Sequence, residues 1–134
     1  MNFVKYIFSV CLVLSSMTFA SMTVVAHPSV ADANLTGAEF QAMFLNKKKS
    51  WSDGTKVIPV VLKGGAVHDA FLAKVKKSAS QFSNYWKQII FTGKGVPPKE
   101  FATDAEAIAY IMATPGAVGY VSAATDGVKT INVN

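Results

Sequence analysis

The residues best suited to binding chemistry lie in one short stretch, KGGAVH, from Lys63 to His68. A nearly all-apolar segment, residues 57–62, precedes it, and a helical pattern begins near Ala66. A strand, a tight glycine turn and a helix direct free backbone N–H groups and the positive end of a helix dipole at one place, which suits a small anion. The alternative is that the glycines serve only the turn. We predict an anion site made of Lys63, Gly64, Gly65, Ala66, Val67 and His68.

Other chemistries find little support in the sequence. The two histidines, His27 and His68, lie far apart, and neither belongs to a cluster with metal-ligand spacing. The Gly-Lys-Gly at residues 93–95 lacks the first glycine and the Ser/Thr of a P-loop, and no Gly-x-Ser-x-Gly elbow is present. We therefore predict a protein that is not an enzyme and that needs no cofactor. We also consider a hydrolase. A structure in which His68 is fully solvated and has no hydrogen-bond partner would nearly exclude that function.

The chain is basic in a particular way. It has 134 residues and a net charge of +5, and all thirteen of its basic residues are lysines. The basicity favours anionic ligands or surfaces. The missing arginine disfavours planar, bidentate recognition of phosphate or carboxylate groups.

The N-terminal segment, residues 1–20, has the pattern of a secretory signal peptide that is removed. Lys5 is its only charge, the apolar core is too short to span a membrane, and Thr18 and Ala20 fit a cleavage site. The remaining domain, residues 21–134, lacks the single cysteine, Cys11, and so has no disulfide. We expect a secreted protein, for which nucleic acid is not a partner.

The first half of the domain predicts a strand, a helix and a second strand. Residues 21–27 read as a strand, and the capping box formed by Thr36 and Glu39 begins a short helix. Lysines 47–49 then read as the solvated end of that helix, with a phosphate- or membrane-binding patch as the alternative. Trp51 is expected to fill the core, and Pro59 in the strand at residues 57–62 suggests an edge or a bulge.

The second half predicts three helices and two strands. The first helix follows the glycine turn, and the next is expected to be capped by Ser80 and to pack its aromatic residues into the core. A loop at residues 91–98 leads to a helix that begins with a capping box at Thr103. Residues 117–122 and 128–133 read as two strands joined by a hairpin turn at residues 126–127. This alternation predicts an α/β fold with a mixed, mainly parallel sheet flanked by helices.

Three stretches together resemble the phosphate-binding proteins of ABC transporters, and in particular their short, single-lobe periplasmic relatives. They are ANLTGAEFQAMFLNKKKSWSDGTKVIPVV, GGAVHDAFL and YWKQIIFTGKGVPPKEFATDAEAIAYIMATPGAVGYV, and they cover nearly all of residues 21–134. The most specific pieces are residues 35–51, the FTGKG loop and the PGAVGYV strand. The resemblance implies a single lobe of the type II periplasmic-binding-protein fold and a bacterial periplasmic location.

The resemblance also bears on the anion site. In two-lobed relatives the second lobe contributes a Ser-Gly-Thr loop at a helix N-terminus, with an arginine nearby. The loop falls here on Gly64, Gly65 and Ala66, so both hydroxyls are gone, and only Lys63 or His68 could replace the arginine.

The implied function is weak binding of phosphate or a related small anion, linked to ABC-type phosphate uptake or sensing. The implied partners are that anion and a membrane transporter or another periplasmic protein. The alternative is a non-catalytic periplasmic protein-interaction module that has lost the phosphate site. A lone lobe exposes its former cleft face, where apolar residues would favour docking and polar residues a small ligand.

Overall fold

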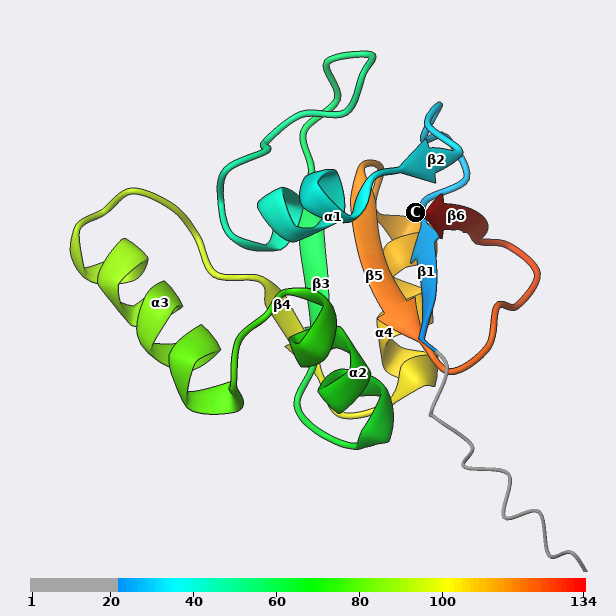
Figure 1. The fold of residues 1–134 in the computed structure, drawn as a ribbon. Helices are drawn as coiled ribbons and strands as arrows, with labels where there is room; N and C mark the ends of the chain where they lie inside the picture. The colour runs from blue at the N-terminus through cyan, green and yellow to red at the C-terminus, as the bar shows by residue number, and fades with distance from the viewer. Residues whose placement is uncertain (1–21) are drawn as a thin grey trace, which may run out of the picture.

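Six strands form one sheet in the order β2-β6-β1-β5-β3-β4 (Figure 1). The structure is a computed structural model that describes residues 22–134, so the predicted signal peptide lies outside the described residues. The strand bounds are β1 Thr23–Ala26, β2 Asn34–Leu35, β3 Ile58–Leu62, β4 Lys99–Phe101, β5 Ala117–Val121 and β6 Lys129–Val133. Three of the five strand pairings are parallel, which confirms the predicted mixed, mainly parallel sheet.

The order of the strands corrects two expectations. The predicted hairpin between the last two strands is wrong, because β1 lies between β5 and β6 and pairs antiparallel with both. Pro59 does not mark an edge, since β3 lies between β5 and β4. The Ile58 N–H points toward β5 and donates to the Gly116 carbonyl. The Pro59 nitrogen therefore faces the opposite side, toward β4, but the pairing of β3 with β4 begins only at the next residue. No donor is needed there. The short strands β2 and β4 were not predicted.

The bounds of the four helices in residues 22–134 are α1 Gly37–Phe44, α2 Ala66–Lys74, α3 Ala79–Phe91 and α4 Asp104–Ala113. Of the four helices, α1 and α4 begin at their predicted N-caps. The capping box of Thr36 and Glu39 is present in full, and Thr103 accepts a hydrogen bond from the Glu106 N–H at 3.2 Å. The predicted cap of α3 at Ser80 is wrong. Ser78 caps this helix, because its hydroxyl and the Gln81 side chain form a capping box two residues earlier.

The core lies on both faces of the sheet. Helices α1 and α2 cover one face and α4 covers the other (Figure 1). Consecutive residues of β5 show the alternation, because Tyr120 stacks on Phe71 of α2 at a centroid distance of 4.4 Å, whereas Gly119 faces Ile111 of α4. Trp51 is buried and donates its Nε1–H to the Gly116 carbonyl at 2.9 Å, which confirms its predicted core role. No helix of residues 22–134 is long and apolar enough to cross a membrane.

Helix α3 stands apart from the sheet (Figure 1). Its buried residues, Phe82 and Trp86, confirm core packing for part of its apolar stripe. Core packing does not account for its C-terminal end, where Ile90 is 49% exposed and Phe91 is 92% exposed. The helix projects beyond the sheet, so its last turn has no layer to pack against.

Candidate functional site

The loop between β3 and α2 has the geometry that the sequence predicted. Helix α2 begins at Ala66, and its N-cap, Gly65, has φ 98° and ψ 175°. This region of φ and ψ is open to glycine and strongly disfavoured for other residues. A Cβ built on Gly64 or Gly65 would meet no atom within 4 Å. The backbone of this loop therefore faces open space.

The N-terminus of α2 differs from the other three in having no side-chain cap. Thr36, Ser78 and Thr103 each accept a backbone N–H at the start of their helix, whereas Gly65 has no side chain to do so. The backbone hydrogen bonding of α2 begins with the Asp69 N–H, which donates to the Gly65 carbonyl at 3.0 Å. The first N–H groups of the helix are thus free for an external acceptor, and the helix dipole favours one with negative charge.

His68 lies at the base of this loop and is held by a tyrosine. Its Nδ1 is 2.5 Å from the Tyr120 Oη, which also accepts the buried Leu62 N–H at 3.0 Å. Because that oxygen already accepts one proton, we assign its own proton to the bond with His68 Nδ1, which leaves the histidine proton on Nε2. Burial raises the pKa of Tyr120 well above its usual range, so the phenol stays protonated and can donate.

The partnered histidine changes the electrostatics predicted for the site. Burial lowers the pKa of His68 from its ordinary value of 6.5, and Asp69 and Glu100 oppose this only in part. The imidazole is therefore neutral at pH 7 and contributes an N–H donor, not a positive charge. Lys63, which is exposed, is the cation of the loop. The solvated, unpartnered His68 that would nearly exclude a hydrolase is not what the structure shows.

A pocket of about 380 Å³ opens beside the loop, between β3, α3 and the segment before β4. Lys63 and His68 line it together with Phe82, Ile90 and Glu100. Its walls are therefore mixed: the side from α3 is mostly apolar, although Ser83 and Lys87 also line it, and the side from the loop is polar. Glu100 places a carboxylate on the same pocket as Lys63, which works against an anion deep inside it and favours one at the loop itself.

Sequence reasoning located the loop but missed Tyr120 and Glu100. Tyr120 carries the only polar side chain in β5, AVGYV, where a hydroxyl needs a partner once buried. This hydroxyl in an otherwise apolar strand was the signal that could have identified Tyr120. Glu100 lies in the unpredicted strand β4, and nothing in the sequence pattern linked it to Lys63.

The His68 assignment predicts how stability depends on pH. Because its pKa is lower in the folded chain, the unfolded chain binds more protons in the window between the two pKa values. The contribution of His68 is then complete above about pH 6.5 and is lost as the pH falls below that value. We expect the urea midpoint to fall from pH 7 to pH 5, and to fall less in His68→Gln. The matched variant His27→Gln should retain the full decrease, and an equal decrease in both variants would contradict the assignment.

No family model matches this sequence, and no curated protein does. Solved structures do match. A protein of Clostridium perfringens, described as a phosphate ABC transporter substrate-binding protein with bound phosphate, aligns with a TM-score of 0.66 at 17% identity, covering 84% of this chain and 44% of that one. PstS of Borrelia burgdorferi aligns with a TM-score of 0.60 at 14% identity, covering 85% and 47%. An ABC-type phosphate transport receptor of Vibrio cholerae aligns with a TM-score of 0.55 at 14% identity, covering 84% and 45%.

The comparisons confirm the predicted fold. The chain has the fold of one part of these binding proteins, and it spans less than half the length of each. The first of these neighbours is described as a substrate-binding protein and the third as a transport receptor.

Proposed function

We propose that residues 21–134 form a single-lobe, periplasmic phosphate-binding-protein-like domain that binds phosphate or a related small anion weakly. In this proposal residues 1–20 are removed as a signal peptide, and the domain serves ABC-type phosphate uptake or sensing. The observation that carries it is the uncapped N-terminus of α2, which lies under open space next to Lys63. Backbone N–H groups at a helix start bind phosphate well without any particular side chain.

The composition of the loop explains why the affinity is expected to be low. The chain has no arginine, His68 is neutral at pH 7, and the loop is open to water. A few N–H groups and one exposed lysine compete there with bulk solvent. We expect a dissociation constant on the order of a millimolar, about −4 kcal/mol.

A charge placed on Gly64 tests this site. Gly64 has no positive φ and has room for a side chain, so Gly64→Asp adds a carboxylate over the N–H groups without straining the backbone. Titration calorimetry with phosphate should show weak binding in the wild type and none in Gly64→Asp. Gly64→Asn, which has the same shape without the charge, is the matched control and should still bind. The absence of heat in the wild type at several millimolar phosphate, or equal binding in Gly64→Asp, would reject the site.

The second candidate function is docking of a protein partner on the pocket beside the loop. Its specific support is the apolar wall that α3 contributes, which includes Phe82 and the half-exposed Ile90. A binding site for a free anion has no use for this wall, whereas a protein partner would bury it. Docking predicts that Ile90→Ser leaves phosphate binding unchanged and weakens partner binding. If the domain binds only a free anion, Ile90→Ser should change neither phosphate binding nor the binding of any protein.

A further inference from the structure

A second pocket lies at the opposite end of β3, and we call it the lysine groove. It has a volume of about 330 Å³ and is bounded by the α1–β3 loop, residues 45–57, and by the α3–β4 loop, residues 92–98. Five lysines line it, and none of the described residues that line it is acidic. They are Lys48, Lys49, Lys56, Lys94 and Lys99. The groove is separate from the β3–α2 loop. That loop follows the last residue of β3, whereas the groove is lined by the first residues of that strand.

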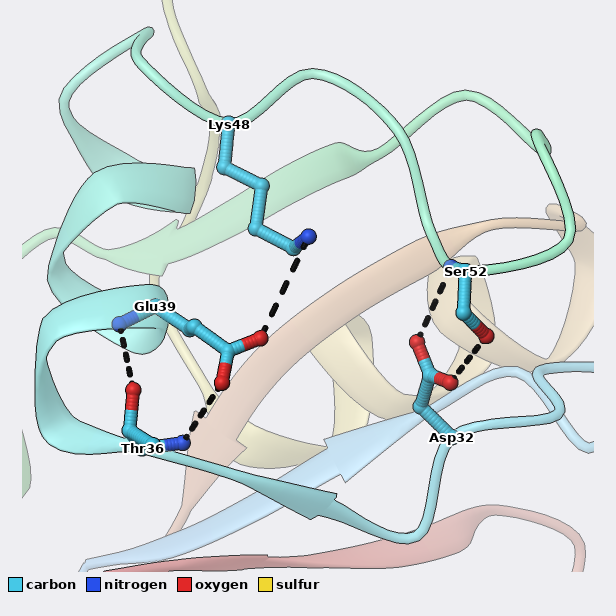
Figure 2. Close-up of polar contacts among 5 residues, drawn as sticks. All are labelled: Asp32, Thr36, Glu39, Lys48 and Ser52. Atoms are coloured by element: carbon cyan, nitrogen blue, oxygen red, sulfur yellow. Dashed lines mark hydrogen bonds and ion pairs between the residues drawn. The ribbon is translucent and has the colours of Figure 1, made fainter.

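The first wall of the lysine groove includes a small hairpin that contributes two of its lysines, Lys49 and Lys56. Ser50 and Lys56 form an antiparallel bridge, and the Val57 N–H donates to the Lys49 carbonyl at 2.9 Å. Figure 2 shows two further attachments of this loop. The Lys48 Nζ lies 4.0 Å from a Glu39 carboxylate oxygen, and Asp32 accepts hydrogen bonds from the backbone and hydroxyl of Ser52.

One side chain ties the second wall directly to the first, and two side chains of α3, the helix before the second wall, bind the end of α1 and the residue after it. The Asn46 Nδ2 donates to the Lys94 carbonyl at 3.2 Å. The Tyr85 hydroxyl donates to the Leu45 carbonyl at 2.6 Å, and the Trp86 Nε1–H donates to the Phe44 carbonyl at 3.1 Å. The groove is therefore formed before any ligand arrives, which lowers the entropic cost of binding.

The lining of the groove indicates the chemistry of its occupant. The floor is apolar, since it includes the buried side chains of Met43, Val57 and Trp86. The single ion pair among residues 22–134 joins Lys48 to Glu39, so the other four lysines face the groove without a carboxylate partner. Lysines complement separate carboxylates, whereas a planar, bidentate contact would call for arginine. A flat membrane surface would not reach the floor of a concave groove.

We propose that the lysine groove binds an extended, acidic segment of a partner protein, in which carboxylates flank an aromatic or aliphatic side chain. The carboxylates pair with the lysines of the rim, and the apolar side chain rests on the floor near Trp86. A polyanion without apolar groups would satisfy the rim and leave the floor wet. This use of the groove goes beyond anion binding at the β3–α2 loop and does not depend on it.

The test uses fluorescence anisotropy with a labelled peptide in which glutamates flank one phenylalanine. The domain is compared with the variant Lys49→Gln/Lys56→Gln, which neutralises two exposed groove lysines. The matched control is Lys74→Gln/Lys76→Gln, which removes the same charge from exposed positions outside the groove. We expect binding that weakens about tenfold in the groove variant, as for the loss of two exposed charge contacts, and stays within about twofold in the control. Thermal melts of all three proteins establish that each is folded.

Two further probes separate the peptide from other occupants. Replacing the phenylalanine of the peptide by serine should weaken binding, and inorganic polyphosphate should compete poorly. Equal binding of the serine peptide, or polyphosphate as the stronger ligand, would overturn the proposal in favour of a general polyanion site. Equal weakening in the two lysine variants would overturn it in favour of attraction by net charge. No binding of the acidic peptide by the wild type would also overturn it.

Discussion

Replacing Gly116 by alanine is expected to destabilise the domain by about 2–5 kcal/mol, one of the largest effects of any conservative change in the chain. Gly116 has φ 84°, and a Cβ there would lie 2.1 Å from the Lys56 carbonyl oxygen. The glycine carbonyl also accepts hydrogen bonds from the Ile58 N–H and the Trp51 Nε1–H. A backbone shift that relieved the overlap with Lys56 would therefore also disturb the hydrogen bonds from Ile58 and Trp51.

The matched control for this prediction is Gly54→Ala. Gly54 has φ 88°, but its Cβ would meet no atom within 4 Å. This variant carries the same unfavourable φ without the overlap and should lose only about 1–2 kcal/mol. Urea unfolding of both variants gives the two free energies. An equal loss would show that φ alone, and not close packing against Lys56, requires a glycine at position 116.

Removing the hydroxyl of Tyr120 is expected to cost about 1–3 kcal/mol, because it leaves the buried Leu62 N–H without an acceptor. The ring itself remains, so the stacking on Phe71 is retained. The same change frees His68 Nδ1, and ¹⁵N NMR of the imidazole should show that the preference for the Nε2–H tautomer is lost.

Tyr110→Phe is the matched control for this second prediction. The Tyr110 ring is partly buried against Phe101, and its hydroxyl makes no hydrogen bond within residues 22–134. Its loss should change the free energy of unfolding by less than about 0.5 kcal/mol and leave the His68 spectrum unchanged. If Tyr120→Phe is equally mild, the hydroxyl does not join β3, β5 and α2 as the distances indicate.

Local patterns in the sequence predicted the helices and most of the strands, whereas contacts between residues far apart in the chain determine how the strands pair. The helix starts at Thr36 and Thr103 were predictable because a cap involves residues only three positions apart. The false hairpin at residues 126–127 arose because a turn between two strand patterns usually joins neighbours. Nothing in the sequence near residues 126–127 reveals that β1 inserts between β5 and β6.

The same division holds for the candidate site. The glycine turn and the start of α2 were predicted from adjacent residues, and both are as expected. The charge of His68 was not predictable, because its partner, Tyr120, lies 52 positions away. The lysines near residue 48 were read as a solvated helix end, although α1 ends at Phe44 and a hairpin bridged at Ser50 and Lys56 follows.

The position of β1 also determines when the chain can fold. Thr23 pairs with Val121, and Val24 pairs with Ile131, so β1 obtains both of its neighbours from segments that are far away in the sequence. Closing such long loops is entropically costly, which slows the pairing at the centre of the sheet. A sheet built in this way is expected to complete its central pairings late in folding.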